Sequence, residues 1–284
     1  TASAVLGDLI SIARQNNKLN SGFVKQVLPQ ADILPPEEAC NTYYMRFMVK
    51  DDPGVLRDLS GALSDQGVSI AQAIQKGQSE AGVPLVFMTH EAPVSAIRKA
   101  VGPDVTIRLD ANQGWKPKEA IRLIGRMEDA GLAIELVEQP VAAADFDGLK
   151  QVTDHVATDI MADESAFSPR DVFRLLAMRA CDLINIKLMK AGGLAPAAQI
   201  AAMADAAGVA CMMGCMLESK VGITAAAALS AGKAVITKND LDAADLMAAD
   251  PVRGGITYDK DHLVVPDAPG LGITAIDGWL PLKD

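Results

Sequence analysis

From residue 105 onward, the sequence repeats one pattern six times: a short apolar run and then an amphipathic helical segment, with about thirty residues per repeat. The six runs lie at residues 105–110, 134–140, 156–165, 181–190, 208–216 and 234–242. Apolar strands that alternate with helices pack as a parallel sheet, because each helix crosses over the sheet between neighbouring strands. We therefore predict an α/β fold with six of the eight strand–helix units of a complete (β/α)₈ barrel.

A different pattern precedes these repeats. Residues 43–50, 68–75 and 84–90 are typical of strands, and helical segments follow the first and the third of them. This β-α-β-β-α order is the ferredoxin-like α+β arrangement without its last strand. Residues 1–40 combine helical spacing with the proline-containing stretch PQADILPPEEACN, which indicates a linker. We expect a helical tail and linker at 1–40, a partial α+β domain at 41–101 and an incomplete barrel at 102–284.

Composition excludes several classes of function. The formal net charge is -10, whereas nucleic acids and anionic membrane surfaces bind proteins with a basic surface. No apolar run reaches about eighteen residues, and the N-terminus lacks the pattern of an export signal, so we expect a soluble cytoplasmic protein. The four cysteines are scattered through apolar stretches, which favours buried packing in a reducing compartment over disulfides or zinc ligation.

Polar residues follow the predicted barrel strands. Asp110, Glu138, Asp163 and Lys187 end four successive strands, and the sequence DLD follows the sixth. In a barrel the carboxyl ends of the strands meet at one face, so these side chains are expected to converge. Three converging carboxylates repel one another unless a hard cation such as Mg²⁺ neutralises them. A lysine beside that cation has a lowered pKa and can act as a base.

The pattern thus predicts proton abstraction next to a carboxylate, with the metal stabilising the enediolate as its charge develops. The alternative is that each acidic residue only caps the helix after its strand. The ordered set D-A-N, V-E-Q-P, A-D-E-S and K-x-x-K-x-G-G, with one motif in each repeat, favours the catalytic interpretation.

The stretch from about residue 102 to 273 resembles dipeptide epimerases of the muconate-lactonizing subgroup of the enolase superfamily. The matching motifs are DANQGW (110–115), VEQP (137–140), ADES (162–165), IKLMKAGG (186–193), MLESKVGITAAA (216–227) and DLDA (240–243). The resemblance implies a dipeptide substrate and a Mg²⁺ cofactor, with three metal ligands, Asp110, Glu138 and Asp163.

The same resemblance makes Lys187 one of two acid/base lysines. It also implies that Asp240 and Asp242 bind the α-ammonium of the substrate, a group that the substrate of a muconate cycloisomerase does not have. For Lys190 and Lys220 we expect supporting or solvated roles.

The sequence departs from this family at the second base, which a K-x-K motif on the second barrel strand supplies. The corresponding window, GQSEAGVPLVF (77–87), contains no lysine, and Lys76 lies too far upstream. The family's N-terminal lid domain is missing as well. Epimerisation is therefore expected to be impaired. An alternative places PLVFMTH (84–90) at the position of barrel strand two with His90 as a substitute base, although a solvated histidine at a strand end is the simpler interpretation.

Residues 1–101 resemble the C-terminal end of homoserine dehydrogenase with its ACT regulatory domain. The resemblance rests on TASAVLGDLISIAR, on residues 43–75 and on PLVFMTHEAPVSAIRKA. It implies that the turn containing Asp52 and Gly54 binds a small amino acid such as threonine at a helix N-terminus, whereas a plain turn before a helix is the alternative. No G-x-G-x-x-G fingerprint is present, so hydride transfer is not expected.

The two resemblances meet at AIRKAVGPDV (96–105), which indicates a chimera. Three interpretations follow: an impaired epimerase, an amino-acid-binding regulatory module, or a non-functional fusion whose open sheet exposes strand edges. Both families commonly assemble, which allows a homo-oligomer, but the sequence does not determine the oligomeric state.

Overall fold

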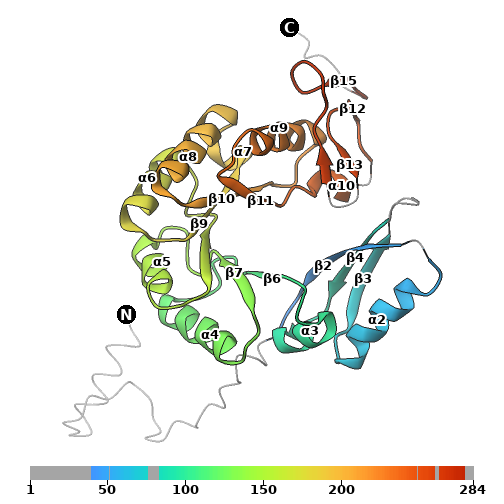
Figure 1. Ribbon diagram of the computed structural model, residues 1–284, viewed down its shortest axis with the longest axis vertical. Coiled ribbons are helices and arrows are strands. Elements are labelled where there is room, and N and C mark those ends of the chain that lie inside the picture. Colours follow the sequence, from blue (N-terminus) through green and yellow to red (C-terminus); the bar gives the residue numbers. More distant parts are fainter. Residues whose placement is uncertain (1–39, 51, 76–82, 248, 260–261, 279–284) are drawn as a thin grey trace, which may run out of the picture. The chain divides into compact units, whose positions relative to one another are not determined.

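The computed structural model describes residues 40–50, 52–75, 83–247, 249–259 and 262–278 (Figure 1). The chain divides into two compact units, residues 1–35 and 36–284, and all the described residues belong to the second. The predicted helical tail and linker at 1–40 therefore lies outside the described residues, except for Cys40 at the start of strand β1 (Cys40–Asn41).

A six-stranded parallel sheet forms the larger part of the described chain. Its order is β11-β10-β9-β8-β7-β6, so each strand lies beside its neighbour in the sequence. The strands are β6 (Ile107–Asp110), β7 (Ile134–Glu138), β8 (Asp159–Ala162), β9 (Leu183–Lys187), β10 (Ala210–Gly214) and β11 (Ile236–Asn239). This arrangement confirms the predicted six-unit partial barrel.

Helices follow the strands and cover one face of this sheet, as Figure 1 shows. They are α4 (Pro117–Asp129), α5 (Phe146–Thr153), α6 (Pro169–Met178), α7 (Leu188–Ala191), α8 (Leu194–Ala207), α9 (Lys220–Ala231) and α10 (Ala243–Leu246). Local sequence fixes where they begin: the side chain of Asp145 accepts a hydrogen bond from the Gly148 amide, and that of Ser168 from the Asp171 amide. Pro117 and Pro169 occupy first helical positions, where proline is favoured.

Side chains alternate across the sheet. On β9, Ile184 and Ile186 belong to the main core against the helices, whereas Leu183 belongs to a second cluster on the opposite face. That second cluster consists of Leu136, Met161, Leu183 and Met212. It forms an apolar layer on the face of the sheet that the helices leave uncovered.

The ferredoxin-like part contains a three-stranded antiparallel sheet in the order β2-β4-β3. Its elements are β2 (Tyr44–Val49), α2 (Val55–Asp65), β3 (Ile70–Gln75), β4 (Val83–Thr89) and α3 (Val94–Val101), and β1 pairs with the short β5 (Ala92–Pro93). The predicted β-α-β-β-α order is confirmed. Its core includes Leu63, Leu85, Phe87 and Ile97.

The alternative that put PLVFMTH at barrel strand two is wrong. Both edges of β4 are occupied by antiparallel partners, β2 and β3, so β4 has no free edge for β6. In the described sheet, β6 pairs with β7. His90 is exposed, directly after β4, which agrees with the simpler interpretation of this residue.

Two short antiparallel pairs near the C-terminus were not predicted. They are β12 (Val252–Gly254) with β15 (Ile273–Ile276), and β13 (Thr257–Asp259) with β14 (His262–Val264). Cys181 and Cys211 are buried as free thiols and Cys215 is half-buried, whereas Cys40 is exposed. Among the described residues, no helix has the length and apolar character to cross a membrane.

Candidate active site

The predicted catalytic side chains lie at the carboxyl edge of the six-stranded sheet. Asp110, Glu138 and Lys187 are the last residues of β6, β7 and β9, and Asp163 follows β8 directly. Asp110 and Glu138 are register partners on adjacent parallel strands. Asp110, Glu138 and Asp240 also line one hollow. The sequence correctly predicted that these residues share one edge.

Asp163 is the most strongly engaged of the three carboxylates. Lys187 Nζ donates to Asp163 Oδ2 at 2.7 Å, and Lys190 donates to Asp163 Oδ1 and, at 2.5 Å, to the Asp163 carbonyl oxygen. Burial by itself would raise the pKa of Asp163, but the two ammonium groups outweigh it and the pKa is lowered. Asp163 is therefore charged and bridges both lysines.

The two lysines differ in their surroundings. Burial lowers the pKa of Lys190, and the nearby Asp163 does not fully offset this effect. Lys187 has its pKa raised: burial lowers it, but Asp163 and then Glu138 and Glu164 more than compensate. A divalent cation would act on Lys187 in the opposite direction. Lys190 is thus buried and paired with Asp163 rather than solvated.

The surroundings of Glu138 and Asp110 disfavour the charged forms of both carboxyl groups. Burial raises the pKa of Glu138 to about 8, with Asp163 and Asp110 contributing, although a hydrogen bond from Asn185 opposes the shift. Burial likewise raises the pKa of Asp110, despite the Asn112 amide that donates to its Oδ1 at 2.8 Å. One half-buried and one exposed carboxyl group, with the buried Asp163 beside them, fit the oxygen-donor chemistry of Mg²⁺.

Asp110, Glu138 and Asp163 do not form a complete set of metal ligands in this structure. Among the described side chains, no three His, Cys, Asp or Glu groups lie close enough together to hold a metal ion. Both carboxylate oxygens of Asp163 face lysine ammonium groups instead. The donor chemistry therefore fits the cation, whereas the side chains would have to shift to surround it.

A buried glutamine that the sequence analysis did not single out connects two of the strand ends. Gln139, fully buried, accepts hydrogen bonds at Oε1 from the amides of Asp163 (2.9 Å) and Ser165 (3.1 Å). Its Nε2 donates to Ser165 Oγ (2.8 Å) and to the Val141 carbonyl (2.9 Å). All four hydrogen-bonding positions of the amide group are used. Gln139 thus fixes the segment that carries Asp163 to the segment that follows Glu138.

Asp240 and Asp242 lie just beyond β11. Partial burial and the neighbouring carboxylate of Asp242 raise the pKa of Asp240. The Asp240 amide donates to the Met213 carbonyl at 2.9 Å, which fixes the start of this segment on β10. Asp242 is the residue before helix α10. Two mutually repelling carboxylates provide a site for a cation such as an ammonium group.

Other predicted residues are placed as follows. Gly54 precedes helix α2 with φ of 103°, and no side chain of the described residues caps that helix. Asp52 is exposed beside it. Lys220 pairs with Asp250, with 2.5 Å between Nζ and Oδ2. Lys76 and residues 77–82 of the window examined for a second base lie outside the described residues.

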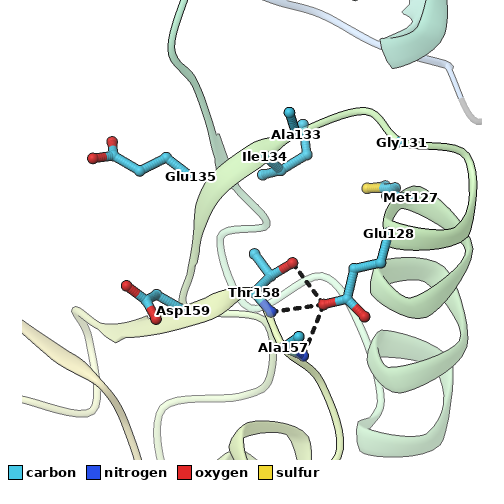
Figure 2. A pocket seen from close by; sticks show the side chains of 9 residues that line it. All are labelled: Met127, Glu128, Gly131, Ala133, Ile134, Glu135, Ala157, Thr158 and Asp159. Atoms are coloured by element: carbon cyan, nitrogen blue, oxygen red, sulfur yellow. Dashed lines mark hydrogen bonds between the residues drawn. The ribbon is translucent and has the colours of Figure 1, made fainter.

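A separate hollow of about 400 Å³ lies at the opposite ends of the strands, where β7 and β8 begin. Figure 2 shows that Glu128 points at the backbone of Ala157 and Thr158, whereas Glu135 and Asp159 point away from it. Glu128 Oε1 accepts hydrogen bonds from both amides and from Thr158 Oγ1. This glutamate therefore joins helix α4 to the loop before β8, a structural role.

Comparison with known proteins identifies the family. The model described as "Enolase C-terminal domain-like" matches residues 76–278, more than half of the chain. The chain belongs to this family. An ACT domain model matches residues 43–102, so the enolase-like and ACT matches overlap at 76–102.

Relatives of this enolase-like chain include epimerases. The L-Ala-D/L-Glu epimerase of Clostridium acetobutylicum is 58% identical over 181 residues, which are 64% of this chain and 51% of that protein. A substrate-liganded structure of the Bacillus subtilis L-Ala-D/L-Glu epimerase matches with a TM-score of 0.63 and 57% identity, covering 64% of this chain and 51% of the other.

A third similar protein is the Enterococcus faecalis dipeptide epimerase in complex with Mg and L-Leu-L-Tyr. It matches with a TM-score of 0.61 and 48% identity over 64% of this chain and 51% of that one. The chain thus spans about half the length of these relatives.

Proposed function

We propose that residues 102–284 catalyse Mg²⁺-dependent 1,1-proton transfer at the α-carbon of a dipeptide such as an alanyl-glutamate. The supporting observation is the contact of Lys187 with Asp163, 2.7 Å between Nζ and Oδ2, at the same sheet edge as Glu138 and Asp110. An acid/base group next to a set of carboxylates is the arrangement that proton abstraction beside a carboxylate requires. The similar epimerases agree with this choice of reaction.

Asp110, Glu138 and Asp163 would hold the Mg²⁺ ion. When bound, the ion would neutralise these carboxylates and stabilise negative charge that develops on the substrate's carboxylate. Lys187 takes the α-proton on one face and returns it to the same face. Asp240 and Asp242 orient the substrate by binding its α-ammonium.

Inversion needs a second base on the opposite face, and the window at 77–87 contains no lysine. The expected activity is therefore exchange of the α-proton with solvent in one epimer, with little conversion to the other. Proton NMR of L-Ala-L-Glu and L-Ala-D-Glu in D₂O with Mg²⁺ tests this expectation. Loss of the glutamate α-proton signal from one epimer alone supports the proposal, whereas no exchange in either dipeptide contradicts it.

A second candidate concerns residues 41–101, which would act as a regulatory module that binds a small amino acid such as threonine. The match to the ACT model and the uncapped start of helix α2 at Gly54 support it. Threonine should then raise the melting temperature of the full chain without Mg²⁺. An unchanged melting temperature at saturating threonine contradicts this candidate.

We also infer that the chain combines parts of two enzymes, an epimerase and a homoserine dehydrogenase. The matches of one chain to an ACT domain model at 43–102 and to the enolase-like model at 76–278 support this inference. Single DNA reads that span codons 90–110 of the gene test whether the two parts are joined. If no read contains both parts, the join does not exist in the genome.

A further inference from the structure

Asn185 is a second buried amide at the carboxyl edge of the sheet. It lies on β9, two residues before Lys187, and its side chain is only 1% exposed. Residues two apart on a strand point to the same face, so Asn185 faces the same interior as Lys187. Asn185 Nδ2 donates a hydrogen bond of 2.7 Å to Glu138 Oε1.

Asn185 also connects to the other carboxylate through its backbone. Lys190 Nζ donates to the Asn185 carbonyl at 3.0 Å and pairs with Asp163. The side chain of Asn185 thus fixes Glu138, and its main chain fixes the lysine that holds Asp163. One residue of β9 therefore reaches two of the three candidate metal ligands.

The space for this amide group comes from the neighbouring strand. A Cβ atom built on Gly214 of β10 would lie 2.4 Å from Asn185 Oδ1 and 3.0 Å from Nδ2. Gly214 is outside the left-handed region of backbone conformation, so its backbone does not require glycine. The requirement at position 214 is therefore set by the Asn185 side chain.

Only the Nδ2 end of the Asn185 amide group has a hydrogen-bond partner among the described residues. Asn185 Oδ1 is buried and has no hydrogen-bond partner among the described residues, so Nδ2 and Glu138 alone orient the group. The Nδ2 end of the amide group is the end that faces Glu138, so Asn185 is the donor in this contact. Displacing the amide would leave Glu138 free to turn.

We propose that Asn185 is a positioning residue that holds Glu138 in the orientation for binding the divalent cation, and that Gly214 is required because it leaves room for Asn185. This inference rests on the proposed function, since it assigns a partner to one of the proposed ligands. Outer-shell partners of this kind typically change metal affinity by about 10- to 100-fold when they are removed.

The test compares Asn185→Leu, which removes the donor, with Gly214→Ala, which displaces the amide without changing Asn185. Asn185→Asp keeps the shape of the side chain and places a carboxylate against Glu138. Gly125→Ala in α4 is the matched control, because a Cβ there meets nothing within 4 Å. Mg²⁺ binding to the full chain is measured by calorimetry, and circular dichroism checks that each variant is folded.

We expect Asn185→Leu and Gly214→Ala each to weaken Mg²⁺ binding by about 10-fold or more, and Asn185→Asp to weaken it further. Gly125→Ala should bind like the parent. Folded variants at 185 and 214 that bind Mg²⁺ as tightly as the parent overturn the inference, while the proposed function stands.

A parent that takes up no Mg²⁺ instead contradicts the proposed function. The role of Asn185 is then decided in the metal-free protein by a double-mutant cycle of Asn185→Leu with Glu138→Gln. Shifts in melting temperature that are clearly non-additive support the coupling of the two residues. Additive shifts overturn it.

Discussion

Lys238 of β11 donates a hydrogen bond to Glu135 of β7, with 2.9 Å between Nζ and Oε1, although three strands separate β7 from β11 in the sheet. Arg108 of β6 binds the other carboxylate oxygen of Glu135 at 2.5 Å between Nε and Oε2. The two outer strands of the described sheet are therefore connected across its concave side by one carboxylate. A flat sheet would not permit this contact.

The Glu135 network should make stability sensitive to acid. Although burial raises the pKa of Glu135, its hydrogen bonds to Arg108 and Lys238 lower it below the ordinary value of 4.5. A lowered folded-state pKa stabilises the fold at pH values above 4.5, and this contribution is lost as the pH falls through the folded pKa. We expect Glu135→Gln to reduce the free energy of unfolding at pH 7, with the difference from the parent shrinking below pH 4.5 in urea titrations. A pH-independent difference would contradict this explanation.

Glu138 should show the opposite dependence. Its folded-state pKa of about 8 lies above the ordinary 4.5, so between these values the folded chain keeps a proton that the unfolded chain has released. Glu138 therefore lowers stability as the pH rises through this window. Mg²⁺ competes with that proton, so its affinity should increase with pH up to about 8. Glu138→Gln should remove both trends in melting curves recorded from pH 5 to 9.

Lys187→Met should lower the rate of α-proton exchange by about 100- to 10,000-fold, the usual contribution of a general acid or base. Lys220→Met is the matched control, because Lys220 pairs with Asp250 rather than with Asp163. The rate is followed by loss of the substrate α-proton signal in D₂O. Equal rates in the Lys187 variant and the parent would remove Lys187 from the mechanism.

Gln139→Ala should destabilise the fold strongly. It leaves the amides of Asp163 and Ser165 without their acceptor in a buried position, at about 1–3 kcal/mol for each unsatisfied group. Gln113→Ala is the control: Gln113 is exposed and accepts one hydrogen bond, from the Ala143 amide at 3.0 Å. Urea unfolding of both variants measures the difference. Similar losses in the two variants would contradict the importance of the buried network.

The sequence predicted the repeated elements well, because apolar periodicity determines them. All six parallel strands and the β-α-β-β-α order follow from it, and the strand-end residues follow from the repeat. Gln139 and Asn185 were not predicted. The sequence shows a polar residue next to an apolar run, but it does not show that the side-chain amide group of this residue is buried. The barrel position considered for PLVFMTH was wrong because strand pairing is a long-range property: residues 44–49 and 70–75 occupy both edges of that strand.

Strand β9 keeps its two sets of side chains apart: Ile184 and Ile186 pack against the helices, whereas Asn185 and Lys187 face the carboxylates. Reaction chemistry and folding can therefore evolve separately on one strand, since a change in one set leaves the other in place. An insertion or deletion of a single residue before Leu183 is the exception. It would exchange the two faces, placing a lysine in the core and an isoleucine in the site, and both properties would be lost in one step.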